Sequence, residues 1–201
     1  MNRQTFDDLL ASIAAKTPAP GGGAVASAVG ALAAALGSMV VAYSVGKKSL
    51  AEHEAPLRDA ATRLENARAV LLALAGEDAA AFSLLSELQR LPEGDARRAS
   101  EEGAAREAVL QAPRAVLAAS LDLLRLLESL VPITNRHLRS DLAIAAVLAE
   151  ATARSAAWNV SVNLPLVPDE GRRADLERET ARMIADARSR ASRVEGACAR
   201  E

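Results

Sequence analysis

The sequence predicts an all-α protein with a single domain, folded as a bundle of about six antiparallel helices. Its 201 residues include 47 alanines and 28 leucines but only two Phe, one Tyr and one Trp. Alanine and leucine favour helices, whereas strands rely on β-branched and aromatic side chains, which are few here. A chain of this length is typical of one domain, and neither a repeat nor a linker divides it.

Residue patterns place the first two helices. Thr5 followed three residues later by Asp8 is typical of a capping box, so the first helix begins there. A turn over 18–23, rich in proline and glycine, precedes a second helix that extends to about Tyr43. This helix belongs to an uncharged stretch, 17–46, which could also be read as a membrane span. Because the stretch is largely Ala, Gly and Ser, we interpret it as a buried helix.

Prolines and polar caps separate the remaining four helices. The third helix stops at the run Pro92-Glu93-Gly94, and the fourth passes through Pro113. The sixth helix is charged on most of its faces. We expect these four helices at about 52–91, at 95–132, from 140 or 141 to 162, and at 174–195.

Charge and cysteine content argue against several classes of protein. The 24 basic and 26 acidic side chains give a net charge of −2, so no positive surface for nucleic acid is expected. Cys198 is the single cysteine and there are two histidines, which argues against a disulfide and against a metal site. The first residues do not form a signal peptide. We therefore expect a cytoplasmic protein that binds neither nucleic acid nor membrane.

Glycines give the second helix one face without side chains. Gly23, Gly30 and Gly37 recur every seven residues and therefore share that face, which lets another helix approach closely. The neighbour is either a helix of the same subunit or the symmetry mate in a dimer, and the sequence supports both equally. The triplet Gly21-Gly22-Gly23 could cradle an anion with its backbone N–H groups, although a structural turn is favoured.

An aspartate interrupts a series of leucines in the third helix. Leu57, Leu64, Leu71 and Leu85 recur at multiples of seven, and position 78 of that series is aspartate. Its neighbours three and four residues away are apolar. Such a carboxylate either pairs with an arginine inside the protein or is a functional group with a raised pKa. We favour the functional interpretation.

Two further groups of polar residues are candidates for binding. Lys47 and Lys48 lie side by side after the uncharged helix, where they either complement the helix dipole or hold an anion. In the fifth helix, Asn159 and Asn163 lie four residues apart on a face that also carries Asp141. Buried amides need partners, which are either backbone groups or a polar ligand.

Several motifs occur together along the chain: Thr17-Pro18-Ala19-Pro20-Gly21-Gly22-Gly23, Met39-Val40, Gly46-Lys47-Lys48, Asp78-Ala79-Ala80-Ala81-Phe82, Leu91-Pro92, Asn135, Ser140-Asp141 and Ser155-Ala156-Ala157-Trp158-Asn159-Val160-Ser161-Val162-Asn163. Their combination resembles the cyclodeaminase/cyclohydrolase family of folate enzymes. That family includes the C-terminal half of formiminotransferase-cyclodeaminase and stand-alone methenyltetrahydrofolate cyclohydrolases. The resemblance covers nearly the whole chain.

The resemblance implies an all-helical homodimer with folate bound in a cleft beside the subunit interface. It implies that Asp78 is the catalytic residue and that Lys47 and Lys48 hold the glutamate tail of the folate, including polyglutamylated forms. No metal and no cofactor other than the folate substrate is implied. The remaining residues implied at the binding site are Asn159, Asn163 and Asp141 at the pterin edge, together with Gly21, Gly22, Gly23, Phe82 and Asn135.

Two reactions are compatible with the family. A cyclohydrolase adds water to methenyltetrahydrofolate and gives formyltetrahydrofolate, whereas a cyclodeaminase closes formiminotetrahydrofolate and releases ammonia. We favour the cyclohydrolase, because no formiminotransferase domain accompanies the sequence. A folate-binding or structural helical dimer without turnover is a third alternative. The chain departs from the family pattern at Ser49-Leu50, where an aromatic residue is usual, at Ala42-Tyr43-Ser44, where asparagine is common, and at Thr134, which replaces glycine.

Overall fold

The computed structural model describes residues 5–17 and 19–199 of the chain. They form the helices α1 (Phe6–Ala14), α2 (Gly22–Ala42), α3 (Glu54–Arg90), α4 (Ala96–Leu130), α5 (Arg139–Asn163) and α6 (Glu170–Cys198). Short 3₁₀ helices lie between them: η1 (Lys48–His53), η2 (Arg136–Leu138) and η3 (Leu164–Leu166). The described ranges contain no strand. The predicted all-α fold is therefore confirmed.

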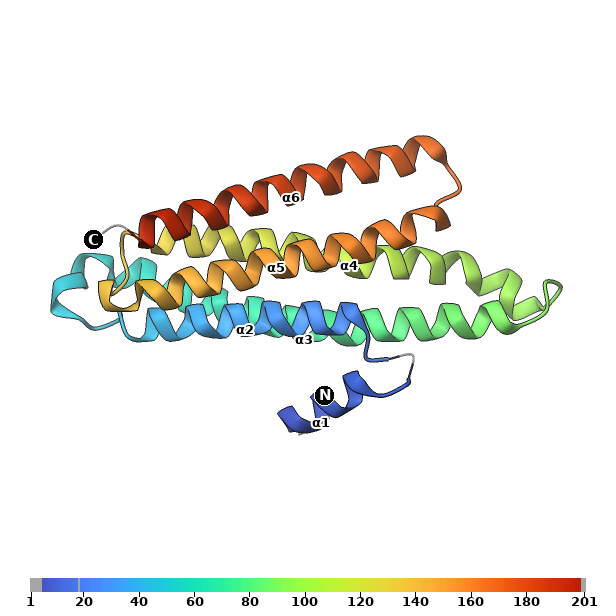
Figure 1. Cartoon of the computed structure of the whole chain (residues 1–201), viewed down its shortest axis with the longest axis horizontal. Coiled ribbons are helices and arrows are strands. Elements are labelled where there is room, and N and C mark those ends of the chain that lie inside the picture. The colour runs from blue at the N-terminus through green and yellow to red at the C-terminus, as the bar shows by residue number, and fades with distance from the viewer. Residues whose placement is uncertain (1–4, 18, 200–201) are drawn as a thin grey trace.

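Four long helices make up the body of the bundle. α2 packs against α3 and α5, and α4 packs against the same two helices. Figure 1 shows α2 and α5 in front of α3 and α4, with α6 along the outside of α4 and α5. Both neighbours of α2 run antiparallel to it, because Asp78 of α3 and Asn159 of α5, each in the C-terminal half of its helix, lie beside the start of α2.

Side-chain caps fix where several helices begin. The Thr5 hydroxyl accepts the Asp8 N–H, and the Asp8 carboxylate accepts the Thr5 N–H, which completes the predicted capping box. Asp95 caps α4 by accepting two backbone N–H groups of its first turn. Asp169 caps α6 by accepting the Arg172 N–H at 2.6 Å. Because of this cap, α6 begins earlier than the sequence pattern predicted.

The glycine face of α2 packs inside the subunit. A Cβ added at Gly30 would lie 2.9 Å from Cγ2 of Thr152 in α5 and 3.1 Å from Cδ1 of Leu71 in α3. A Cβ at Gly37 would lie 2.9 Å from Cδ2 of Leu127 in α4. The missing side chains thus let three helices approach α2 within one chain. The alternative, in which this face crosses a symmetry mate, is wrong.

Among the described residues, two helical stretches, Gly22–Ala42 and Lys48–Arg90, are long and apolar enough to cross a membrane by length and composition. A helix that is apolar on all sides is found both in membranes and in protein cores. Within α2, 50% of the apolar window is buried inside the bundle. This burial agrees with the interpretation of α2 as a core helix.

The two terminal helices make fewer contacts with the bundle than the others. α1 has no buried residue, its Phe6 is 64% exposed, and Figure 1 shows it apart from the other helices. α6 packs on α4 and α5 and is linked to α4 by charge, because Glu128 accepts hydrogen bonds from Arg190 and Arg193. The residues of α6 that are buried are Leu176, Thr180, Ala187, Ala191 and Val194.

Candidate active site

The leucine series of α3 meets the glycines of α2 in register. Leu71 lies against Gly30, and one repeat later Asp78 lies against Gly23. A Cβ at Gly23 would overlap the carboxylate of Asp78, so the glycine lets the carboxylate lie at this place. The fold thus brings together two features that the sequence marked separately, the interrupted leucine series and the glycine turn.

Asp78 is half-buried and has no partner of opposite charge. Within residues 5–17 and 19–199, no group donates a hydrogen bond to its carboxylate or forms an ion pair with it. The alternative of an internal salt bridge to an arginine is therefore wrong. Burial raises the pKa of Asp78 above its ordinary value. This carboxyl group therefore holds a proton more readily than an exposed aspartate does.

The start of α2 places hydrogen-bond donors beside this carboxylate. Gly21 is the N-cap of α2, and the first backbone bond runs from the Val25 N–H to the Gly21 carbonyl. The N–H groups of residues 22–24 therefore have no acceptor within the helix. Asn159 of α5 lies on the other side, with its Oδ1 3.8 Å from where a Cβ at Gly22 would be.

Phe82 and Asn163 lie near this group in different ways. Phe82 follows Asp78 by one turn of α3 and is 48% exposed, so its ring is accessible to a ligand. Asn163 donates through Nδ2 to the Val109 carbonyl at 2.7 Å, so its amide links α5 to α4. We define the aspartate site as Gly21, Gly22, Gly23, Asp78, Phe82 and Asn159.

Ser27 was not singled out from the sequence as a functional candidate. It is fully buried one turn after Gly23, and its Oγ has no hydrogen-bond partner in the part of the chain that the structure describes. Other buried helical serines, such as Ser120, donate to the carbonyl four residues earlier. An unsatisfied buried hydroxyl is costly. No sequence signal distinguishes Ser27, because serine is also a common small residue on closely packed faces.

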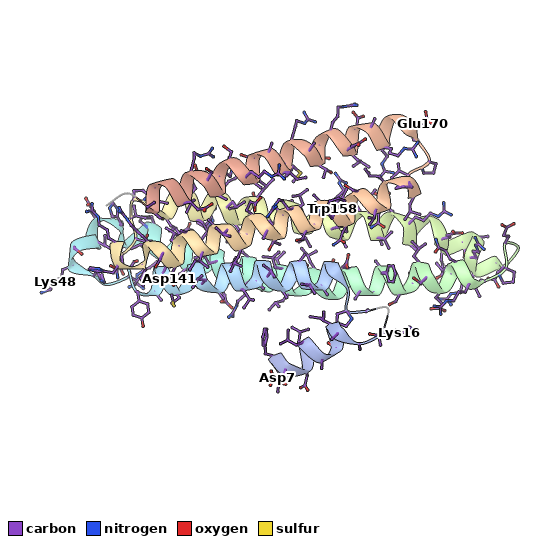
Figure 2. The ribbon with its side chains drawn as sticks, in the orientation of Figure 1. Asp7, Lys16, Lys48, Asp141, Trp158 and Glu170 are labelled. Carbon is purple, nitrogen blue, oxygen red and sulfur yellow. The ribbon has the colours of Figure 1, made fainter. Side chains whose placement is uncertain are left out.

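The other candidate residues lie at the opposite end of α2. Lys47 and Lys48 follow that helix, and the Asn135 N–H donates to the Ser44 hydroxyl at 2.9 Å, which holds the start of α5 beside them. Asp141 lies in the first turn of α5. Figure 2 shows Lys48 and Asp141 toward the same end of the bundle. We define the lysine site as Lys47, Lys48, Asn135 and Asp141.

The two sites are far apart within one chain. α2 contains 21 residues, and at about 1.5 Å per residue it is roughly 30 Å long. The aspartate site lies at its start and the lysine site beyond its end. A single subunit therefore does not bring the lysine pair to Asp78, although the interpretation from sequence placed all of these residues in one binding site.

Histidine and cysteine side chains form no cluster of their own. His137 is exposed at the lysine end of the bundle. Burial raises the pKa of the Cys198 thiol near the end of α6. Among the described residues, no group of three or more His, Cys, Asp or Glu is placed to hold a metal ion.

Comparison with known proteins decides the family. A family model described as Formiminotransferase-cyclodeaminase matches residues 5–182. The chain belongs to this family. The formiminotransferase-cyclodeaminase match includes the aspartate site, the lysine site and the first part of α6.

Individual members of the family match over most of this chain, but the matched share of their own length differs. Methenyltetrahydrofolate cyclohydrolase from Methylorubrum extorquens is 31% identical over 192 residues, which is 92% of this chain and 90% of that protein. Formimidoyltransferase-cyclodeaminase from Sus scrofa is 30% identical over 187 residues, which is 90% of this chain but 34% of that protein. The crystal structure of formiminotetrahydrofolate cyclodeaminase from Thermotoga maritima has a TM-score of 0.88 and 31% identity, covering 97% of this chain and 96% of that one.

Proposed function

We propose that this chain is a folate one-carbon enzyme that hydrolyses 5,10-methenyltetrahydrofolate to 10-formyltetrahydrofolate. The proposal rests on the half-buried, unpaired carboxylate of Asp78 beside the N–H groups at the start of α2. It is supported by the relative named methenyltetrahydrofolate cyclohydrolase, which aligns over 90% of its own length.

We assign the proton transfers of this reaction to Asp78. Water adds to the amidinium carbon of the substrate, and the tetrahedral adduct then breaks one C–N bond. Asp78 takes a proton from the attacking water and returns it to the departing nitrogen. Its raised pKa suits both steps, because the group must hold the proton between them. Before the attack, its negative charge stabilises the delocalised cation of the substrate. The reaction needs neither a metal nor another cofactor.

Other residues of the two sites bind the folate. Asn159 and the N–H groups of residues 22–24 offer donors and acceptors to the pterin edge, and Phe82 offers a ring on which it can stack. Lys47 and Lys48 offer point charges to the anionic glutamate tail. Because they lie the length of α2 away from Asp78, they reach a folate bound there only from a second subunit. We further propose that the protein is a homodimer and acts in the cytoplasm.

A second candidate function is cyclodeamination. It is favoured by the likeness to formiminotetrahydrofolate cyclodeaminase from Thermotoga maritima, which covers 96% of that chain. In this reaction a nitrogen of the folate attacks the formimino carbon, and ammonia leaves from the tetrahedral adduct. Asp78 would then give its proton to the departing ammonia.

The decisive experiment offers both substrates to the purified protein. Methenyltetrahydrofolate is followed by the loss of its absorbance, and formiminotetrahydrofolate by the gain of the same absorbance together with ammonia. We expect hydrolysis of the first, and Asp78→Asn should reduce turnover at least ~10²-fold through loss of the acid–base group. The control is Asp59→Asn, an exposed aspartate on the same helix, which should leave turnover unchanged.

Each other outcome has a definite meaning. Ammonia release from formiminotetrahydrofolate would select the cyclodeaminase. Binding of both folates without turnover of either would select the non-catalytic folate-binding dimer. Full activity of Asp78→Asn would remove Asp78 from the mechanism.

A further inference from the structure

A small groove lies between α5 and α6, outside the aspartate site. Its volume is about 280 Å³, and we call it the tryptophan groove. Pockets for small molecules typically combine apolar walls with a few polar groups that fix the orientation of the ligand. The tryptophan groove has this composition, because one aromatic ring, two apolar side chains, a hydroxyl and two guanidinium groups line it. The residues are Arg154, Ala157, Trp158 and Ser161 of α5 and Ile184 and Arg188 of α6.

Trp158, the single tryptophan of the chain, offers an open ring to this groove. It is 74% exposed, and Figure 2 marks its place on α5. Large aromatic side chains stabilise a fold by being buried, which this ring is not. A planar ligand that stacks on the indole would remove the exposed surface from water. The position of Trp158 therefore suits binding better than packing.

The two arginines of the groove share one carboxylate. Nε of Arg154 lies 2.8 Å from Oε1 of Glu150, and Nε of Arg188 lies 3.9 Å from the same oxygen. Within residues 5–17 and 19–199, neither arginine forms an ion pair with another acidic group. The groove therefore carries one positive charge in excess. At least half of each arginine side chain is exposed, so both guanidinium groups are accessible to an anion.

We propose that the tryptophan groove binds an aromatic ring that carries carboxylate groups. The ring stacks on Trp158, and the carboxylates pair with Arg154 and Arg188, whose planar guanidinium groups match carboxylate geometry. The volume of about 280 Å³ lies just below the range typical of pockets for drug-sized ligands. It therefore suits one ring with its carboxylates rather than a whole folate.

Two sources could supply this chemistry. One is the aminobenzoyl-glutamate part of a folate whose pterin is bound at the aspartate site, and this source rests on the proposed function. The other is a free aromatic carboxylate.

The position of the groove allows the first source within one subunit. Trp158 directly precedes Asn159 of the aspartate site, so about 100° of helix rotation separates the two side chains. An α-helix with its side chains is about 10 Å wide, and the tail has only to cross one side of α5. The lysine site is then left to the further residues of a polyglutamate tail.

The fluorescence of Trp158 tests the groove directly, because the chain has no other tryptophan. The purified full chain is titrated with 4-aminobenzoyl-glutamate. We expect saturable quenching in the wild type. The double variant Arg154→Ala, Arg188→Ala should bind at least ~10-fold more weakly, because it loses both charged donors. Quenching that does not saturate in the wild type, or equal affinity in the wild type and this double variant, would overturn the proposal.

Two further variants keep this result interpretable. Arg63→Ala, Arg178→Ala is the matched control, which removes two exposed arginines that lie outside the groove and should bind as the wild type does. Arg188→Ala alone leaves the ion pair between Arg154 and Glu150 intact. It tests the groove if the double variant does not fold, and it should weaken binding several-fold. An affinity equal to that of the wild type in this folded variant would count against the proposal.

Turnover distinguishes the two sources of the ligand. If the groove holds the tail of the substrate, the Arg154→Ala, Arg188→Ala variant should raise KM for methenyltetrahydrofolate about tenfold and leave kcat unchanged. An unchanged KM together with saturable quenching would assign the groove to a free aromatic carboxylate. If the wild type turns over neither folate, the proposed function fails, and the fluorescence titration still decides whether the groove binds an aromatic carboxylate.

Discussion

Two crossings of α2 and α3 share the same geometry and differ in one side chain. At Gly30 the side chain from α3 is Leu71, which is fully buried and adds apolar packing. One repeat away, at Gly23, it is Asp78, which is half-buried and unpaired. The contact with glycine is close in both cases. The two helices keep the same packing register at both positions, and in the proposed function the second contact serves chemistry instead of stability.

Removing the leucine should have the largest effect on stability. Leu71→Ala leaves a cavity in the core, and we expect a loss of about 2–5 kcal/mol in the free energy of unfolding, measured by chemical denaturation. Leu72→Ala is the matched control, because Leu72 is the exposed neighbour on the same helix. It should change stability by no more than ~0.5 kcal/mol. Equal losses for the two variants would contradict the assignment of Leu71 to the core.

Adding one methyl group at each glycine separates the two crossings. Gly30→Ala crowds Leu71 and Thr152 and should cost about 1–3 kcal/mol. Gly23→Ala meets only the end of the Asp78 side chain, which can turn aside. Stability should therefore change little, while turnover falls by up to ~10²-fold because the carboxylate is misplaced.

Gly103→Ala is the control for both glycine variants. Nothing lies within 4 Å of a Cβ at Gly103, so this change should stabilise α4 by about 0.5–1 kcal/mol. A Gly23→Ala variant that loses stability but keeps full turnover would contradict the assignment of Gly23 to the aspartate site.

The stability of Asp78→Asn relative to wild type should depend on pH. The pKa of Asp78 is raised in the folded protein, so folding favours its protonated form. Its stabilising contribution is complete below its ordinary pKa of 3.8 and is lost as the pH rises through the folded value. Asparagine does not titrate. Denaturation at a series of pH values should show the variant gaining on wild type as the pH rises through that window. An advantage that stays constant would contradict the raised pKa.

The smallest effect is expected at Ser27, beside the aspartate site. Ser27→Ala removes a buried hydroxyl that has no partner among the described residues. The free energy of unfolding should therefore stay the same or rise by up to ~1 kcal/mol, which a melting curve would show as an equal or higher melting temperature. Ser120→Ala is the comparison, since the Ser120 hydroxyl donates to the Val116 carbonyl at 2.7 Å. A loss of turnover in Ser27→Ala without a change in folding would show that the hydroxyl serves the substrate.

The sequence predicted the two parts of the aspartate site, Asp78 and the glycine face of α2, but not that they contact each other. Repeats of seven fix a face of a helix, so the leucine series located Asp78 and the glycine series located the face of α2 that it contacts. Neither repeat says which helix lies opposite, because that depends on the tertiary fold. From the sequence alone, a crossing between subunits is therefore an equal alternative, whereas in the structure Leu71 and Thr152 lie against Gly30.

Two further features show what a local sequence pattern can and cannot predict. The amide of Asn163 could have bonded to a ligand or to the backbone, and its acceptor, the Val109 carbonyl, is 54 residues away in the chain. Only tertiary structure brings the two together. The distance between Gly23 and Lys47, by contrast, follows from the sequence, since an uninterrupted helix must hold its two ends apart.

The packing of α6 on one side of the bundle has a consequence for how the folded chain opens. α2 is packed among the long helices α3, α4 and α5. α6 lies outside them on α4 and α5, and it is held in part by ion pairs of Glu128. Partly exposed ion pairs contribute little and weaken with salt. Native-state hydrogen exchange should therefore detect α6 as a separate cooperative unit, whose amides exchange when α6 detaches from the bundle. The amides of α2 should exchange through global unfolding.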